Sequence, residues 1–166
     1  MENLSFHFDS LSMESQLTET WSISNRINLY LLDGIEDEAL GDVSASKGRS
    51  VAESFAHLHN VRLMWLKTAA PELLEGLEKI EKEVALDRKL LKNSLEASSR
   101  AIEILLIKSA AAGGKVKGFK PHAVAFLGYL ISHESHHRGQ IILALKQSGH
   151  PIDKKIAYGI WEWGSR

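Results

Sequence analysis

Apolar residues recur at three- and four-residue spacing along four long stretches of the chain, and short joints rich in glycine, proline and polar residues separate them. This spacing is that of one face of an α-helix. The stretches run from about Ser10 to Leu32, from Ser50 to just before Pro71, from about Asp87 to the sequence AAAGGK, and from Pro121 to about Ser148. No segment alternates apolar and polar residues convincingly for more than a few positions. The pattern therefore predicts an all-α fold, a four-helix bundle.

Residues near the joints indicate where the helices begin. Ser50, followed three residues later by Glu53, predicts a capping box at the start of the second helix. Pro121 fits the first turn of the fourth helix, where its missing N–H leaves no hydrogen bond unmade. Residues 71–86 are expected to form a short helix and a connection, and Ile156 to Trp163 a short C-terminal helix.

Composition narrows the class of protein. The length of 166 residues suits one domain with a substantial core, and no repeat or long linker divides residues 1–166. The chain has no cysteine, which excludes disulfides, thiolate-held zinc and a nucleophilic thiol of its own. A formal net charge of −1 gives no electrostatic reason to expect nucleic acid or a membrane as partner. Without a signal peptide or an apolar run of ~18–20 residues, a cytoplasmic location is expected.

Eight histidines are present, and five of them fall on the second and fourth helices. His133 and His137 are one helical turn apart on one flank of the apolar stripe centred on Leu127, so their imidazoles can converge on one ion. His136 points away from that stripe. The spacing predicts His133 and His137 as metal ligands, with two hydrogen-bonded histidines and no metal as the alternative. Three histidines near segment ends have no expected ligand role: His7, His122 and His150.

A third ligand is available on the second helix. His57 and His59 flank Leu58 from opposite sides, and helical geometry alone does not choose between them. The choice depends on which side the neighbouring helix occupies. Three imidazoles with one open position would form a common catalytic metal arrangement.

The sequence HESHH also contains the H-E-x-x-H pattern of zinc proteases. A metzincin continues with a glycine and a further histidine, but Gln140 and Leu143 occupy those positions. Glu134 falls near the middle of the apolar stripe with Arg138 one turn later, which predicts an internal ion pair between them. We therefore do not expect a zincin protease.

Several longer segments support a family resemblance. They are AHL at Ala56–Leu58, with His57 eight residues before Trp65, then GFKPHAVAFLGYL, HESHHRGQIILALKQSGHP and AYGIWEWG. Over nearly the whole chain, these segments resemble the DinB/YfiT-like family. The resemblance implies a metal-binding four-helix bundle, commonly a homodimer, whose metal is held by one histidine of the second helix and two of the fourth. Carried over, the ligands are His57, His133 and His137, with His59 as the substitute for His57.

Such a site suits zinc, nickel or iron, and the ligand type does not name the metal. Two enzymatic functions are expected for a small-molecule substrate. One is hydrolysis by a water that the ion activates, and the other is a transfer or isomerisation with a low-molecular-weight thiol as cosubstrate. The alternative is a non-catalytic, stress-response metal-binding bundle, in which His59 or Glu53 closes the coordination.

Other residues of these segments have structural interpretations. Arg62 is expected to form a buried ion pair with a carboxylate, with contact to a substrate anion as the alternative. Trp65 is expected in the core, and Trp161 and Trp163 in packing, a pocket wall or a dimer contact. Three residues of the histidine motif, Arg138, Gly139 and Gln140, are expected to support the ligands or to pack, and the glycine would let another helix approach closely.

Overall fold

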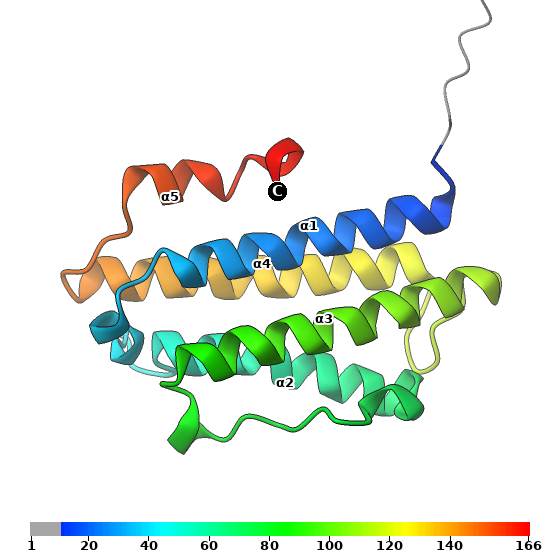
Figure 1. Ribbon diagram of the computed structural model, residues 1–166, viewed down its shortest axis with the longest axis horizontal. Coiled ribbons are helices and arrows are strands. Elements are labelled where there is room, and N and C mark those ends of the chain that lie inside the picture. The colour runs from blue at the N-terminus through cyan, green and yellow to red at the C-terminus, as the bar shows by residue number, and fades with distance from the viewer. Residues whose placement is uncertain (1–10) are drawn as a thin grey trace, which may run out of the picture.

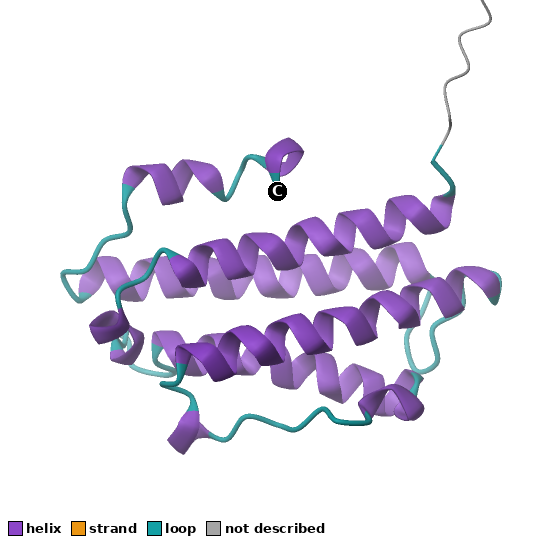
Figure 2. Cartoon of the chain, in the orientation of Figure 1, coloured by secondary structure: helices purple, strands orange, loops and turns teal. Residues whose placement is uncertain are grey.

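The computed structural model describes residues 11–166 and contains four long α-helices and one short one in that range. The long helices are α1 (Met13–Asp33), α2 (Val51–Ala69), α3 (Arg88–Ala111) and α4 (Ala123–Gln147), and the short one is α5 (Lys154–Gly159). Figure 2 shows these helices joined by loops, without a strand among the residues drawn in colour. The all-α bundle with a short C-terminal helix is confirmed. His7 and Ser10 lie outside the described residues.

Each long helix packs mainly against two others. α1 and α2 both contact α3 and α4. Figure 1 shows that α1 runs parallel to α4 and α2 runs parallel to α3, so the chain between α2 and α3 must return along the length of the bundle. α2 and α4 run in opposite directions and contact each other. No helix in the described range is long and apolar enough to cross a membrane.

The start of α2 agrees with the sequence. The Glu53 N–H donates to Ser50 Oγ at 3.1 Å, and the Ser50 N–H donates to Glu53 Oε2 at 2.9 Å. These reciprocal bonds form the predicted capping box and satisfy two N–H groups that the helix leaves free. The capping box fixes the first turn of α2, two turns before His57.

The crossover between α2 and α3 is less helical than expected. It contains two short 3-10 turns, η2 (Pro71–Leu74) and η3 (Lys82–Val84), separated by extended chain. The Asn60 side chain donates to the Ile80 carbonyl and accepts from the Ile80 N–H, both at 2.9 Å. Because α2 holds the extended backbone in this way, no helix is needed to satisfy it.

The expected place of Pro121 in the first turn of α4 is wrong. His122 is the N-cap, and its Nδ1 accepts from the Ala125 N–H at 3.2 Å. The helix begins at Ala123, so Pro121 precedes the cap. A side chain that accepts this hydrogen bond defines the helix start, and proline cannot supply one.

The C-terminal helix also differs from the expected range. α5 begins at Lys154 and ends at Gly159, and a 3-10 turn, η4 (Trp163–Ser165), follows. Figure 1 shows α5 lying along the outer side of α1. A Cβ on Gly159 would clash with the Tyr30 hydroxyl, so glycine permits this close approach. Trp161 is 77% exposed, and packing within the chain does not account for it.

The core consists of two apolar clusters with a polar layer between them. One cluster includes Leu31, Leu58, Leu95 and Leu145, and the other includes Trp21, Leu66, Ile102 and Phe126. On each helix, buried polar residues lie between the positions that belong to the two clusters: Asn25 and Asn28 on α1, Arg62 on α2, Ser98 on α3, and Glu134 and Arg138 on α4. Polar groups at this depth require internal partners.

Arg62 and Glu134 form the centre of the polar layer. Arg62 Nε donates to Glu134 Oε1 at 2.7 Å, and both side chains are 1% exposed. Asn28 donates to the other Glu134 oxygen at 2.7 Å and accepts from Arg138 Nη1 at 2.6 Å. The expected pairing of Arg62 with a carboxylate is confirmed. The expected direct pairing of Glu134 with Arg138 is wrong, because Arg62 and Asn28 occupy both oxygens of that carboxylate.

Candidate metal centre

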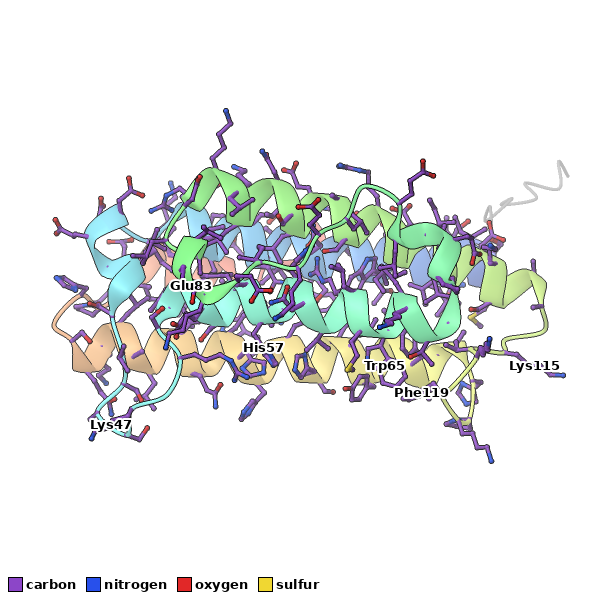
Figure 3. All side chains as sticks on the ribbon, turned by 90° about the horizontal axis from the view of Figure 1, so that it is seen from below. Lys47, His57, Trp65, Glu83, Lys115 and Phe119 are labelled. Carbon is purple, nitrogen blue, oxygen red and sulfur yellow. The ribbon has the colours of Figure 1, made fainter. Side chains whose placement is uncertain are left out.

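Three histidines meet where α2 packs against α4. His57 comes from α2 and lies on the side of this helix that faces α4 in Figure 3, while His133 and His137 occupy consecutive turns of α4. The ring centroid of His137 is 4.6 Å from that of His57 and 4.6 Å from that of His133, and the remaining pair is 5.3 Å apart. One ligand nitrogen from each ring lies within 4.8 Å of the other two. The three histidines are therefore close enough to hold one metal ion.

His59 and His136 contribute no nitrogen to this cluster, although the His136 ring centroid is 5.2 Å from that of His137. The His59 ring is 1% exposed, and its two nitrogens lie 2.9 Å from the Ser94 carbonyl and 2.8 Å from the Glu78 carbonyl. It ties α2 to the crossover and to α3. His136 is exposed on the outer side of α4. The packing of α4 thus brings His57, and not His59, beside the pair on α4.

The spacing of the nitrogens fits a shared ion. His133 Nε2 and His137 Nε2 are 3.1 Å apart. Two nitrogens bound tetrahedrally at about 2.0–2.1 Å from one zinc ion would be separated by about 3.3 Å. The two imidazoles thus already have nearly the separation of ligands in one coordination sphere.

Gln140 orients one of the candidate ligands. Its Oε1 lies 2.7 Å from His137 Nδ1, and an amide oxygen can only accept a hydrogen bond. The proton of a neutral His137 is therefore on Nδ1, which leaves the Nε2 lone pair directed at the cluster. This is the supporting role that the sequence motif suggested for Gln140.

The three imidazoles are held in a form suited to coordination. Burial lowers the pKa of His57 from 6.5 to about 4, and the charge of Arg49 and the two other imidazoles act in the same direction. Burial is also the largest cause that lowers the pKa of His133 and of His137. A pKa below 6.5 favours the neutral form of each ring at pH 7, and only a neutral imidazole has a free lone pair for a metal.

The glutamate of H-E-x-x-H does not face the histidines. Glu134 is 1% exposed and gives both carboxylate oxygens to the polar layer, to Arg62 and Asn28. Successive residues of a helix differ in direction by about 100°, so His133 turns to α2 while Glu134 turns into the core. The carboxylate therefore cannot serve as the base of a zincin.

The surroundings of the cluster differ on its two sides. On one side, the Tyr129 ring stacks on His133 with centroids 6.2 Å apart, and Trp65, Phe119 and Phe126 continue this apolar wall. Trp65, expected in the core, is half-buried there. Figure 3 shows Trp65 and Phe119 near one end of the α2–α4 contact.

On the other side, a pocket of about 600 Å³ opens beside His57. Its lining includes Arg49, Glu53, Lys79 and Lys82. Arg49 could not be recognised from sequence, because this residue lies in a polar loop without periodicity. A larger cleft, of about 1070 Å³, lies under the 115–121 loop, but none of the three histidines lines it.

Parallel α1 and α4, a long crossover and a three-histidine cluster between α2 and α4 define a helical bundle with a group of side chains that could hold a metal ion. The family model of the DinB family matches residues 6–159, and the chain belongs to that family. Neither a curated protein nor a solved structure matches the chain.

Proposed function

We propose that the chain binds one divalent transition-metal ion, zinc, nickel or iron, through His57, His133 and His137, and that it catalyses a transfer or isomerisation with a low-molecular-weight thiol. The observation that carries this proposal is the convergence of three desolvated, neutral imidazoles on one point. Three neutral ligands leave the ion its full charge and one open position.

The candidates for a fourth protein ligand are otherwise engaged. Both His59 nitrogens lie at backbone carbonyls on the far side of α2. Glu53 accepts from the Ser50 N–H and pairs with Lys82 at 3.2 Å. Within residues 11–166, the cluster contains only the three histidines. An open position supports catalysis over the alternative of a non-catalytic, stress-response bundle.

The distribution of carboxylates favours the thiol reaction over hydrolysis. A bound divalent ion would acidify a thiol or water and polarise a carbonyl at its open position. Hydrolysis also benefits from a base near the water, but Glu134 lies in the core and Glu53 in the helix cap. A thiol needs no such base once it is ionised. The chain has no cysteine, so the sulfur must come from the cosubstrate.

The metal content of the purified protein depends on the three histidines. Purified protein should contain about one transition-metal ion per chain, and His137→Ala should lose it because two imidazoles bind far more weakly than three. His136→Ala is the matched control, since its exposed ring is adjacent in sequence but outside the cluster, and it should keep the ion. Elemental analysis of tag-free protein measures all three. Equal metal content in the two variants would contradict the three-histidine site.

The reaction class can be tested on cobalt-loaded protein. Titration with 2-mercaptoethanol should change the visible and near-ultraviolet absorption, as sulfur enters the open position. Turnover of esters without a response to thiols would identify the hydrolase, and a response to neither would identify the non-catalytic bundle.

The homodimer remains a prediction, and sedimentation velocity would give twice the 18.5 kDa of the chain.

A further inference from the structure

The pocket beside His57 contains one cationic side chain that no carboxylate neutralises. Two of its lysines are paired, Lys79 with Glu81 at 3.0 Å and Lys82 with Glu53 at 3.2 Å. Arg49 lines the same pocket and has no ion-pair partner among the residues that the structure describes. The pocket therefore carries one excess positive charge, and Arg49 supplies it.

Arg49 and His57 line the same pocket, so one molecule bound there can contact both side chains. A divalent ion with three neutral ligands would add its own two charges nearby. The combined field favours a negatively charged molecule, since no free carboxylate of the pocket offsets it.

The loop that carries Arg49 is anchored to both helices of the site. The Ala45 N–H donates to Gln147 Oε1 at 2.8 Å, and Ser148 Oγ donates to the Val43 carbonyl at 3.3 Å, which ties the loop to the end of α4. Arg49 immediately precedes Ser50, the N-cap of α2. The backbone of Arg49 is thus positioned by the same two helices that position the histidines.

The turn before Arg49 depends on glycine. Gly48 has φ +111°, a conformation that residues with a side chain rarely adopt. It follows Lys47, whose N–H donates to the Ser44 carbonyl at 2.8 Å to close the turn. The chain reverses at this point and brings Arg49 back to the pocket.

We propose that Arg49 binds the carboxylate of a small anionic thiol substrate while the sulfur reaches the open position at the histidine cluster. A guanidinium presents two parallel N–H groups that match the two oxygens of a carboxylate. This inference rests on the proposed function, because it names the class of thiol that the site accepts. Arg49 would then be a specificity-determining residue for that thiol. Arg62, for which contact to a substrate anion was the alternative, cannot take this role because its side chain is buried.

The test compares two thiols with the same spacing between sulfur and carbonyl carbon on cobalt-loaded protein: 3-mercaptopropionate and its neutral methyl ester. Absorption titrations give a dissociation constant for each. The wild type should bind the acid about 10-fold more tightly than the ester, the ratio expected from one charge-assisted pair. Arg49→Gln should abolish this preference and leave the affinity for the ester unchanged, and Arg49→Lys should retain part of it. Lys79→Gln removes a paired charge from the same pocket and should keep the preference.

The outcomes separate this inference from the proposed function. Equal affinity for the acid and the ester in the wild type, or a preference that survives Arg49→Gln, overturns the role of Arg49 while the metal site stands. Bound cobalt without a response to either thiol overturns both the anchor and the thiol reaction. Protein that binds no cobalt overturns the metal site and with it the anchor. The cobalt content of Arg49→Gln should equal that of the wild type, since Arg49 is not a ligand.

Discussion

Gln140 shows how a residue outside the histidine cluster sets its chemistry. Its amide oxygen, 2.7 Å from His137 Nδ1, selects the tautomer in which Nε2 is free. Without this partner, the ring can rotate or carry its proton on the other nitrogen. Residues that orient a histidine ligand commonly contribute 10–100-fold, roughly, to metal affinity.

We therefore predict that Gln140→Leu weakens metal binding by about 10- to 100-fold and leaves the fold intact. The leucine keeps the approximate size of the side chain but accepts no hydrogen bond from His137. Competition with a chelator of known affinity measures the change, and circular dichroism verifies the helix content. Unchanged affinity would mean that the packing of α4 alone orients the ring.

The residues of the cluster were predictable to different degrees. His133 and His137 share one helix, so the helical period alone places them side by side. His57 required knowledge of which helix lies next to α2, and geometry within α2 left it equivalent to His59. Arg49 was not predictable, because its position depends on hydrogen bonds between a loop and the distant end of α4.

At the scale of elements, α4 uses three faces for three purposes. One face carries His133 and His137, a second turns Glu134 and Arg138 into the core, and a third is exposed at Gly139. The close approach of another helix at Gly139 is not found, since no atom of residues 11–166 outside the adjacent backbone of α4 lies within 4 Å of where its Cβ would be. Within the chain, this glycine only weakens the helix.

Gly139→Ala should therefore raise the free energy of unfolding by about 1 kcal/mol, the difference in helix propensity between the two residues. Gly159→Ala is the contrasting control and should lower the free energy of unfolding, because the new methyl group meets the Tyr30 ring. Urea denaturation followed by circular dichroism measures both. A loss of stability in Gly139→Ala would indicate that a partner molecule packs on this face.

The loop between α1 and α2 is tied to the end of α4 by a pair that depends on pH. His150 Nδ1 lies 2.7 Å from Asp42 Oδ2, and this hydrogen bond, followed by the charge of Asp42, raises the pKa of His150 above 6.5. A raised pKa in the folded state means that the pair stabilises the fold fully below about pH 6.5. That contribution is lost as the pH rises through the raised pKa.

We predict that proton NMR gives His150 a pKa above 6.5 and that Asp42→Asn lowers it towards that value. The stability difference between the wild type and His150→Gln should be larger at pH 6 than at pH 9. The effect is expected to be small, because the pair is partly exposed. A difference that grows with pH would contradict the assigned charge state.

At the scale of the whole molecule, the polar layer determines how the four helices fit together. Arg62 bonds Asn25 on α1, the Leu95 carbonyl on α3 and Glu134 on α4, so this one side chain joins α2 to the three other long helices. The same layer orients α4, because Glu134 and Arg138 can reach their partners at only one rotation of α4 about its axis. At that rotation His133 and His137 face α2.

Glu134→Gln should lower the free energy of unfolding by about 3–5 kcal/mol, because it leaves the buried guanidinium groups of Arg62 and Arg138 without a counter-charge. Replacing Arg62 and Glu134 together by methionine should recover part of this loss, since the charge of Arg62 is then removed with its counter-charge and only Arg138 stays without one. Chemical denaturation measures both variants. Equal stability of Glu134→Gln and the wild type would show that the carboxylate is not needed as a charge.

Sequence periodicity was sufficient to predict the bundle and the extents of its long helices. It could not predict the parallel course of α2 and α3, because the length of the crossover is compatible with several arrangements. The partner of Glu134 could not be predicted either. A pattern within α4 suggests Arg138 but carries no information about α2, which supplies Arg62. Contacts between elements distant in sequence form only in the assembled fold.

The α2–α4 contact also affects the local opening of the bundle. His57 and the pair on α4 are joined by the chain only through the crossover, α3 and a loop, so an ion held between them ties together two helices distant in sequence. Because such an ion binds only the closed form, its release lowers the cost of local opening at this contact and leaves the α1–α3 and α2–α3 contacts untouched. Amide hydrogens in the middle of α4 would then exchange with solvent sooner than those of α3. The availability of metal would thereby control how often the α2–α4 contact opens locally.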